Sequence, residues 1–167
     1  HFLSGYTAKI AGTEAGISEP QVTFSACFGK AFLPLHPTFY AALLGEKLKA
    51  HKVNVWLVNT GWSGGPYSVG KRINLSYTRA MVSAALNGEL DEQDFITEPF
   101  FGLSIPLRCA NVPSEILNPK DTWKDKDEYL GTAMELREAF RINFAQFEDF
   151  ANDEIRSAVP KASEIIT

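Results

Sequence analysis

Histidine and cysteine are scarce in this chain, and the spacings through which they most often act are missing. Three histidines and two cysteines occur among 167 residues. They form no C-x-x-C and no H-x-x-x-H pair, so the sequence offers no zinc or redox site of those kinds. His1, His36 and His51 are dispersed. His36 precedes Pro37 at a helix entry, where capping or packing is favoured over catalysis.

Long apolar runs and an excess of positive charge are also missing. No apolar run approaches the roughly 20 residues that span a membrane. The net charge is −4 and the pI about 5.4, which argues against a broad nucleic-acid surface, because such surfaces hold phosphates through lysine and arginine. The first residues carry no basic segment followed by an apolar one. We therefore expect no signal peptide and interpret the chain as the middle of a longer one.

The two cysteines lie far apart, at Cys27 and Cys109, in strand-like surroundings. Buried free thiols are favoured here over a disulfide, and they are typical of a reducing compartment. We therefore expect a cytoplasmic protein. With 45% hydrophobic residues, the chain is long enough to form one domain with a substantial core.

The most informative stretch runs from Val53 to Arg79. Val53–Val58 predicts a strand buried on both faces. A loop with four glycines follows, ending in Lys71 and Arg72, and a helix is expected to begin near Ser76. A strand, a basic glycine-rich loop and a helix start let backbone N–H groups and fixed cations approach a phosphate or a ring. This arrangement favours nucleotide binding.

The segment Gly65–Lys71 also matches the phosphate-loop pattern G-x-x-x-x-G-K. Arg72, however, stands where such a loop needs Ser or Thr for its magnesium ion. The first glycine also lies seven residues beyond Val58, whereas a phosphate loop turns directly off its strand. We therefore expect the loop to meet a nucleotide in another manner.

Two helices are predicted from local signals. Pro37 begins a helix over 37–50, whose apolar positions are Phe39, Leu43, Leu44 and Leu48. Joined to the strand at 53–58 by two residues, it makes an αβ unit and predicts an α/β fold. A second helix, over 78–87, stops at Gly88.

Further strands are predicted at 22–28 and 101–107, the second limited by Pro106. The last helix is expected to start at Asp121 or Thr122. Residues 153–167 are expected to be a peripheral tail. The apolar stripe of the last helix predicts a core face made of Leu130, Ala133, Met134, Phe140, Phe144 and Phe147.

Two segments leave alternatives open. Glycines at 5, 12 and 16 make residues 4–21 a long loop, either disordered or a moving lid over a site. Five carboxylates between Glu89 and Glu98 suggest a metal site at first sight. Their spacing matches no ligand loop, so a solvated acidic surface is favoured.

Eight blocks of this sequence carry a resemblance: His1–Glu14, Thr23–Gly29, Leu35–Thr38, Leu57–Trp62, Gly70–Ile73, Thr78–Arg79, Ala85–Leu90 and Val112–Pro119. In this order they closely resemble the C-terminal part of ATP-dependent phosphoenolpyruvate carboxykinases, and the resemblance extends to about Phe150. GTP-using relatives differ in these blocks. The resemblance implies an α/β fold containing a portion of the C-terminal mononucleotide-binding domain, with a mixed sheet and flanking helices, over residues 1–152.

The resemblance also implies a function. The family converts oxaloacetate and ATP to phosphoenolpyruvate, ADP and CO2 with Mg²⁺ and Mn²⁺, as a lyase of gluconeogenesis. The resemblance implies that residues 5–24 are the active-site lid, and the candidate functional residues of this lid are Thr7, Lys9, Gly12 and Thr13. Residues 59–79 become a nucleotide-binding loop and helix start, in which Arg72, Ile73 and Thr78 contact ATP. Arg72 can stack on the adenine or bond ribose and phosphate; a surface salt bridge is the alternative.

The family's phosphate loop, metal ligands and oxaloacetate-binding arginine lie upstream of the matched region. The resemblance therefore implies no catalytic residue and no metal ligand in this chain, which we expect to be inactive alone. The expected partners are ATP and ADP, with oxaloacetate and phosphoenolpyruvate bound through other parts of the enzyme; a homo-oligomer is possible, and neither nucleic acid nor membrane is expected. A non-catalytic nucleotide-binding or interaction module, or a structural fold without a ligand, remain the alternatives.

Overall fold

The computed structural model describes residues 1–9 and 21–161. These form two compact units. The first comprises His1–Asn54 and Glu138–Pro160, and Val55–Arg137 makes up the body of the second. None of the helices in the described residues is long and apolar enough to cross a membrane.

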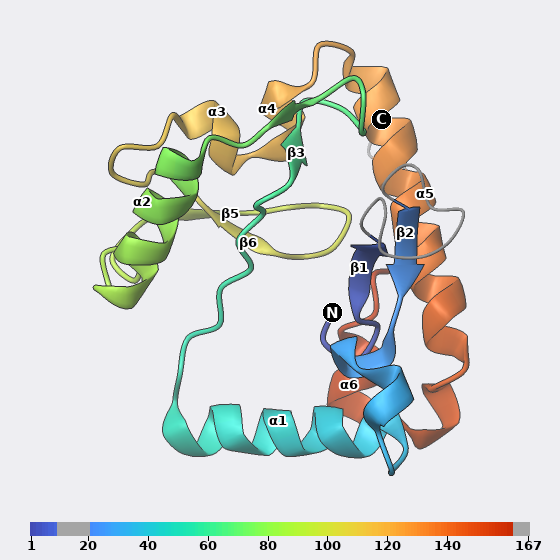
Figure 1. Ribbon diagram of the computed structural model, residues 1–167. Coiled ribbons are helices and arrows are strands. Elements are labelled where there is room, and N and C mark those ends of the chain that lie inside the picture. Colours follow the sequence, from blue (N-terminus) through green and yellow to red (C-terminus); the bar gives the residue numbers. More distant parts are fainter. Residues whose placement is uncertain (10–20, 162–167) are drawn as a thin grey trace. The chain divides into compact units, whose positions relative to one another are not determined.

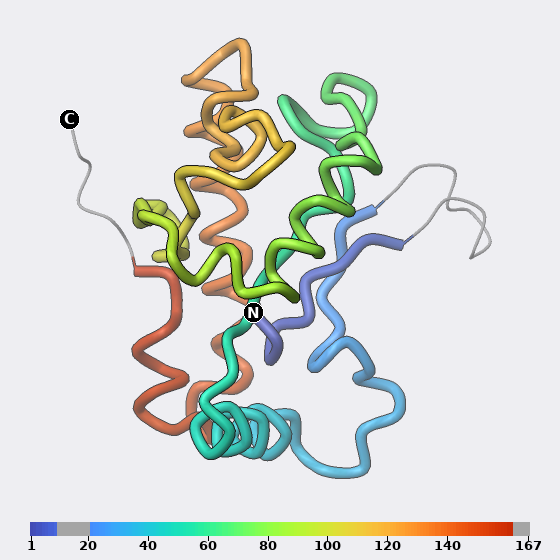
Figure 2. Tube along the Cα trace, turned by 90° about the vertical axis from the view of Figure 1, so that its left-hand side faces the viewer, coloured from blue at the N-terminus to red at the C-terminus, as the bar shows by residue number. Residues whose placement is uncertain are grey.

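The first unit begins with an antiparallel hairpin of β1 (Tyr6–Lys9) and β2 (Gln21–Phe24), side by side in both views (Figures 1 and 2). The short turns η1 (Ala26–Phe28) and η2 (Lys30–Phe32) lead into α1 (Pro37–His51). The end of α5 (Lys126–Ala145) belongs to this unit, as do η3 (Glu148–Phe150) and α6 (Asp153–Ser157).

Aromatic and small side chains form the core of the first unit. The ring centroids of Tyr6 and Phe24 lie 5.4 and 5.3 Å, respectively, from the ring centroid of Phe140. The segment expected to be a peripheral tail contributes to this core through Ile155 and Val159. The buried cluster on which these two pack is Leu3, Ala26, Phe144, Phe147 and Ala151.

The second unit holds two more antiparallel pairs. β3 (Trp62–Ser63) pairs with β4 (Lys71–Arg72), and β5 (Phe95–Thr97) pairs with β6 (Ser104–Pro106). The helices are α2 (Leu75–Leu86), α3 (Ser114–Leu117), α4 (Pro119–Thr122) and the first part of α5. Its core cluster is Ala84, Leu90 and Cys109, with Trp56, Met81, Ala85, Val112 and Leu117 packed against it.

The helices predicted at 37–50 and 78–87 are confirmed, although the second begins earlier, at Leu75, and the first differs in what it buries. α1 starts at Pro37, and α2 is followed by Gly88 at φ +74°. The apolar stripe of α1 is not buried, however, since Phe39 is 54% exposed and Leu43 41% exposed. The small residue Ala41 packs against the core of the first unit instead.

The predicted strand at Val53–Val58 is wrong. These residues form no regular secondary structure, and the side chains of Val55 and Leu57 are 63% and 53% exposed. A strand is stabilised by hydrogen bonds to a neighbour, and no strand of the described residues pairs with this segment. The expected mixed sheet is likewise replaced, in the part of the chain that is described, by three separate two-stranded antiparallel sheets. The α/β class itself is confirmed.

Other boundaries also differ from those predicted. Residues 6–9, expected to be part of a loop, form β1, and the strand predicted at 101–107 is confined to Ser104–Pro106. The strand at 22–28 ends at Phe24, because Cys27 and Phe28 adopt left-handed conformations with φ of +52° and +60°. The last long helix starts at Lys126, after the separate short helix α4. Asp125 sets this start, since its carboxylate accepts hydrogen bonds from the backbone N–H groups of Asp127 (2.9 Å) and Glu128 (3.1 Å).

The predicted core face of this last helix is confirmed in four positions and wrong in two. Ala133, Phe140 and Phe144 are buried within the helix, and Phe147 is buried just beyond its end. Leu130 and Met134 are 36% and 46% exposed. The stripe is therefore continuous in the sequence but is covered along only part of its length.

Candidate functional site

The glycine-rich loop of the second unit is a tightly closed hairpin. Asn59 turns the chain into it: its Oδ1 accepts from Gly61 N (2.9 Å) and its Nδ2 donates to the Trp62 carbonyl (3.2 Å). Ile73 N then donates to the Gly61 carbonyl (3.0 Å), closing the hairpin at its base. Between these points β3 and β4 pair, with Trp62 directly opposite Arg72. The hairpin therefore holds Arg72 at a defined position.

The tip of this hairpin depends on two glycines. Gly65 adopts φ +150°, which side-chain-bearing residues rarely do. At Gly70 a Cβ would lie 2.8 Å from the Ser63 carbonyl oxygen and closer still to that of Gly65. The N–H groups of Val69 and Gly70 both donate to the Pro66 carbonyl, at 3.1 and 2.8 Å. They point inward, whereas a phosphate loop presents its N–H groups to the ligand.

Arg72 is exposed on β4, and its guanidinium carbon lies 5.9 Å from the centroid of the Trp62 ring. The Trp62 ring meets the Tyr67 ring edge-on, with centroids 5.3 Å apart and planes at 82°. Among the described residues no carboxylate forms an ion pair with Arg72. The salt-bridge interpretation of Arg72 therefore has no partner in this part of the chain.

Ile73 and Thr78 lie on either side of the start of α2. Asn74 caps this helix, its Oδ1 accepting from the Ser76 N–H at 2.9 Å. Thr78 N donates to the Asn74 carbonyl (3.2 Å), and Ile73 N is occupied by Gly61. Both backbone N–H groups are therefore engaged within the protein and do not offer a donor to a ligand in this conformation.

Residues 61–65 also match G-x-S-x-G, the spacing of a serine-hydrolase nucleophile turn. Ser63 lies within β3 and not on a strand-to-helix turn. Its Oγ donates to Thr122 Oγ1 (3.0 Å), which donates to the Pro119 carbonyl (2.7 Å). Ser63 thus ties the hairpin to α4, and no histidine bonds to it among the described residues.

The lid candidates belong to the first unit. Thr7 and Lys9 lie on β1, opposite Thr23 and Gln21 of β2. Thr7 is exposed and Lys9 half-buried. Gly12 and Thr13 lie outside the described residues.

The described residues bring together no three His, Cys, Asp or Glu side chains that could hold a metal ion. The predicted solvated acidic surface is confirmed at Glu89, Asp91, Glu92 and Asp94 and is wrong at Glu98. Glu98 is buried because its carboxylate accepts from Phe100 N (3.0 Å) and Phe101 N (2.7 Å), closing the turn between β5 and β6. This part of the chain therefore does not fit the role of a Mg²⁺ or Mn²⁺ site.

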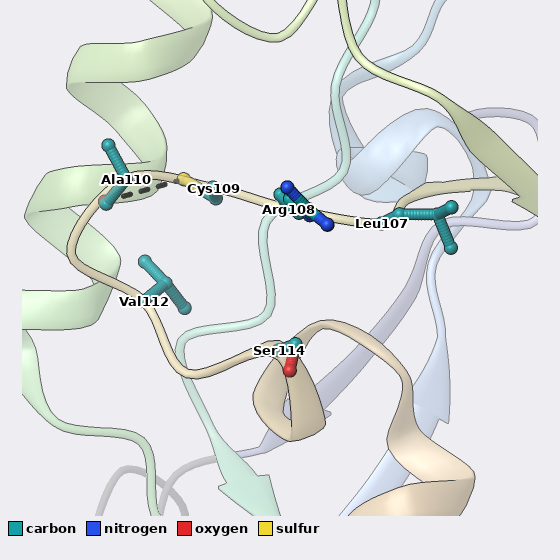
Figure 3. Close-up of a pocket in the computed structure, with 6 residues that line it drawn as sticks. All are labelled: Leu107, Arg108, Cys109, Ala110, Val112 and Ser114. Carbon is teal, nitrogen blue, oxygen red and sulfur yellow. Dashed lines mark hydrogen bonds between the residues drawn. The ribbon is translucent and has the colours of Figure 1, made fainter.

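Both cysteines are free thiols, as predicted, but only Cys109 is buried and Cys27 is half-buried. Burial raises the pKa of Cys27, and burial together with the charge of Glu89 raises that of Cys109. A cavity of about 500 Å³ lies beside Cys109 (Figure 3). None of the residues predicted to bind a nucleotide lines it; the lining residues are Leu107, Arg108, Cys109, Ala110, Val112 and Ser114.

Comparison with known proteins identifies what this chain is similar to. The family model described as phosphoenolpyruvate carboxykinase matches residues 1–115. A protein of Flavobacterium johnsoniae named phosphoenolpyruvate carboxykinase (ATP) is 59% identical over 160 residues, which cover 96% of this chain and 30% of that protein. Proteins with the same name are 60% identical over 161 residues in Caldanaerobacter subterraneus (96% of this chain, 31% of that protein) and 59% over 152 in Geobacter metallireducens (91% and 29%). The chain thus spans about 30% of the length of these relatives.

Proposed function

Since the chain belongs to the ATP-dependent phosphoenolpyruvate carboxykinase family, we propose that it is part of an enzyme that converts oxaloacetate and ATP to phosphoenolpyruvate, ADP and CO2. Within that enzyme, this chain would supply contacts to the nucleotide and a lid. It would correspond to a portion of the C-terminal domain, as the resemblance of its sequence blocks implies.

The observation that carries the nucleotide proposal is the placement of Arg72. An exposed guanidinium, which forms no ion pair within the described part of the chain, stands on a hairpin that hydrogen bonds and two glycines hold closed. A guanidinium held in this way can stack on an adenine or donate a fork of hydrogen bonds to ribose or phosphate oxygens. Ile73 follows at once, and Thr78 lies on the first turns of α2. The proposed ATP contacts are therefore Arg72, Ile73 and Thr78.

The proposed lid is the segment 5–24, of which the described part is the β1–β2 hairpin. A hairpin that closes over the reacting groups would exclude water, strengthen the electrostatic interactions with the transferring phosphoryl group and protect the enolate formed when CO2 leaves. Lys9 would bring positive charge to that site and Thr7 a hydroxyl. We propose that Gly12 and Thr13 belong to the same lid.

Metal binding and oxaloacetate binding are assigned to the rest of the enzyme. The described residues do not fit a metal site, so the ligands of Mg²⁺ or Mn²⁺ would come from elsewhere in the protein. The chain alone would then be inactive, because the groups that bind the metal ions and oxaloacetate would be missing.

A chimaera tests the proposal. This chain replaces the aligned 160-residue segment of the Flavobacterium johnsoniae protein, and release of CO2 from oxaloacetate is measured with ATP. Arg72→Ala should raise the KM for ATP by about ten- to a hundredfold, the size of a lost hydrogen bond to a charged group. Lys71→Ala is the matched control. It removes one exposed charge from the neighbouring β4 position, whose side chain points to the opposite face of the hairpin, and it should change the KM less than about twofold.

Two outcomes would count against the proposal. An inactive chimaera that is folded would contradict the carboxykinase function. An unchanged KM in Arg72→Ala would favour a structural role for the hairpin without a ligand.

The alternative of a non-catalytic nucleotide-binding module is separated by calorimetry of the isolated chain with ATP and GTP. We expect weak or no binding, because the phosphate side of the site would be absent, and circular dichroism should show that the chain is folded during the titration. Saturable binding of ATP by the isolated chain would support the module instead.

A further inference from the structure

Trp62 is the aromatic partner of Arg72. The two residues lie directly opposite each other in the β3–β4 ladder, where side chains of opposed residues emerge on the same face about 5 Å apart. The guanidinium carbon lies 5.9 Å from the centroid of the Trp62 ring, within the range of a cation–π interaction. Since Arg72 has no ion pair among the described residues, the ring is the contact that restrains its side chain there.

The Trp62 ring is itself held from several directions. It is partly buried and meets the Tyr67 ring edge-on at 5.3 Å. The backbone carbonyl of Trp62 accepts a hydrogen bond from the Asn59 side chain (3.2 Å). The two neighbouring residues are also bonded: the Gly61 carbonyl accepts from Ile73 N, and Ser63 Oγ donates to Thr122 Oγ1. The ring is therefore a fixed surface, against which a long and otherwise mobile arginine can rest.

We propose that Trp62 is a positioning residue for Arg72: its ring face holds the guanidinium in place before a nucleotide arrives. This inference rests on the proposed role of Arg72 in binding ATP. A nucleotide that meets a free arginine must bind and also order it, whereas one that meets an arginine already held loses less conformational freedom. Trp62 should thus improve ATP binding while acting through Arg72.

The test is a double-mutant cycle in the chimaera described above. Trp62→Leu should raise the KM for ATP by about two- to fivefold, the size of a cation–π interaction at an exposed site, with kcat unchanged. Trp62→Phe keeps an aromatic face and should restore most of the binding. In the Arg72→Ala background, Trp62→Leu should raise the KM no further, because the group it positions is gone. Val82→Ala, a change at an exposed position of α2 outside the loop, should leave the KM for ATP unchanged.

Each outcome decides the inference. Additive effects of the two substitutions would overturn it, since they would mean that Trp62 contacts the nucleotide by itself. A KM raised by Arg72→Ala but not by Trp62→Leu would overturn it and leave the proposed function standing. An unchanged KM in Arg72→Ala would overturn both. If Trp62→Leu does not fold, Trp62→Phe is used in its place. The inference is supported if Trp62→Phe raises the KM for ATP less than Arg72→Ala does, and raises it no further in the Arg72→Ala background. Additive effects of Trp62→Phe and Arg72→Ala would refute it.

Discussion

Gly5 closes the base of the β1–β2 hairpin that we propose as part of the lid. It is buried and adopts φ +59°. Its carbonyl accepts from Ser25 N (3.0 Å), the residue after β2. A Cβ at this position would overlap the Ser25 carbonyl oxygen and lie 2.9 Å from Phe28 N, and both obstacles are backbone atoms that cannot rotate away. Replacing Gly5 with alanine should therefore separate the two strands at their base.

The cost of Gly5→Ala has two sources. A left-handed conformation costs a side-chain-bearing residue about 1–2 kcal/mol. Forcing an extra carbon into a packed site adds about 1–3 kcal/mol. The free energy of unfolding should fall by about 2–5 kcal/mol in total, which for a chain of this size lowers Tm by about 4–20 °C.

Urea unfolding and thermal unfolding followed by circular dichroism measure this loss. Gly45→Ala is the matched control, since Gly45 lies within α1 of the same unit and a Cβ there meets no heavy atom within 4 Å. It should raise the free energy of unfolding by about 0.5–1 kcal/mol. If Gly5→Ala unfolds within about 0.5 kcal/mol of the unsubstituted chain, the hairpin base tolerates a side chain and the reasoning is refuted.

Two further predictions concern the second unit. Burial, with smaller contributions from the charges of Glu98 and Asp121, raises the pKa of Tyr129 from 10.0 to about 12. The folded state thus holds this proton more tightly than the unfolded state, so the stabilisation is complete below about pH 10 and is lost as the pH rises from 10 to 12. The free energy of unfolding measured against pH should show this fall, and Tyr129→Phe should reduce it; an equal fall in the variant would contradict the assignment. Asn74→Ala removes the cap of α2 and should cost about 1 kcal/mol in urea unfolding, whereas Asn74→Ser should cost little; equal losses would mean that the cap hydrogen bond is unimportant.

Local signals in the sequence predicted α1 and α2 well, but not the short helices α3, α4 and α6. Pro37 and Gly88 stand just inside the start of α1 and just past the end of α2, because the fixed φ of proline suits a helix start and glycine adopts the left-handed conformation that follows a helix end. The missing Ser or Thr after Lys71 likewise argued against a phosphate loop, and the inward bonds of Val69 and Gly70 agree.

Strand predictions failed where pairing was needed. The residues Val53–Val58 have the composition of a buried strand, but a strand also requires a neighbour, and the described residues provide none. Composition also concealed the turn at Cys27 and Phe28, because left-handed backbone at non-glycine residues has no sequence signal as clear as glycine.

By itself, the sequence determined the family, the helices α1 and α2, the basic glycine-rich loop and the place of Arg72 in it, since each of these depends on neighbouring residues. The tertiary structure alone decided that Trp62 faces Arg72, that Ser63 bonds to Thr122, and that Ile155 packs against the first core. Each of these contacts joins residues that lie apart along the chain. They are set by strand register and by packing, which depend on the folded backbone and not on the spacing of residues within a motif.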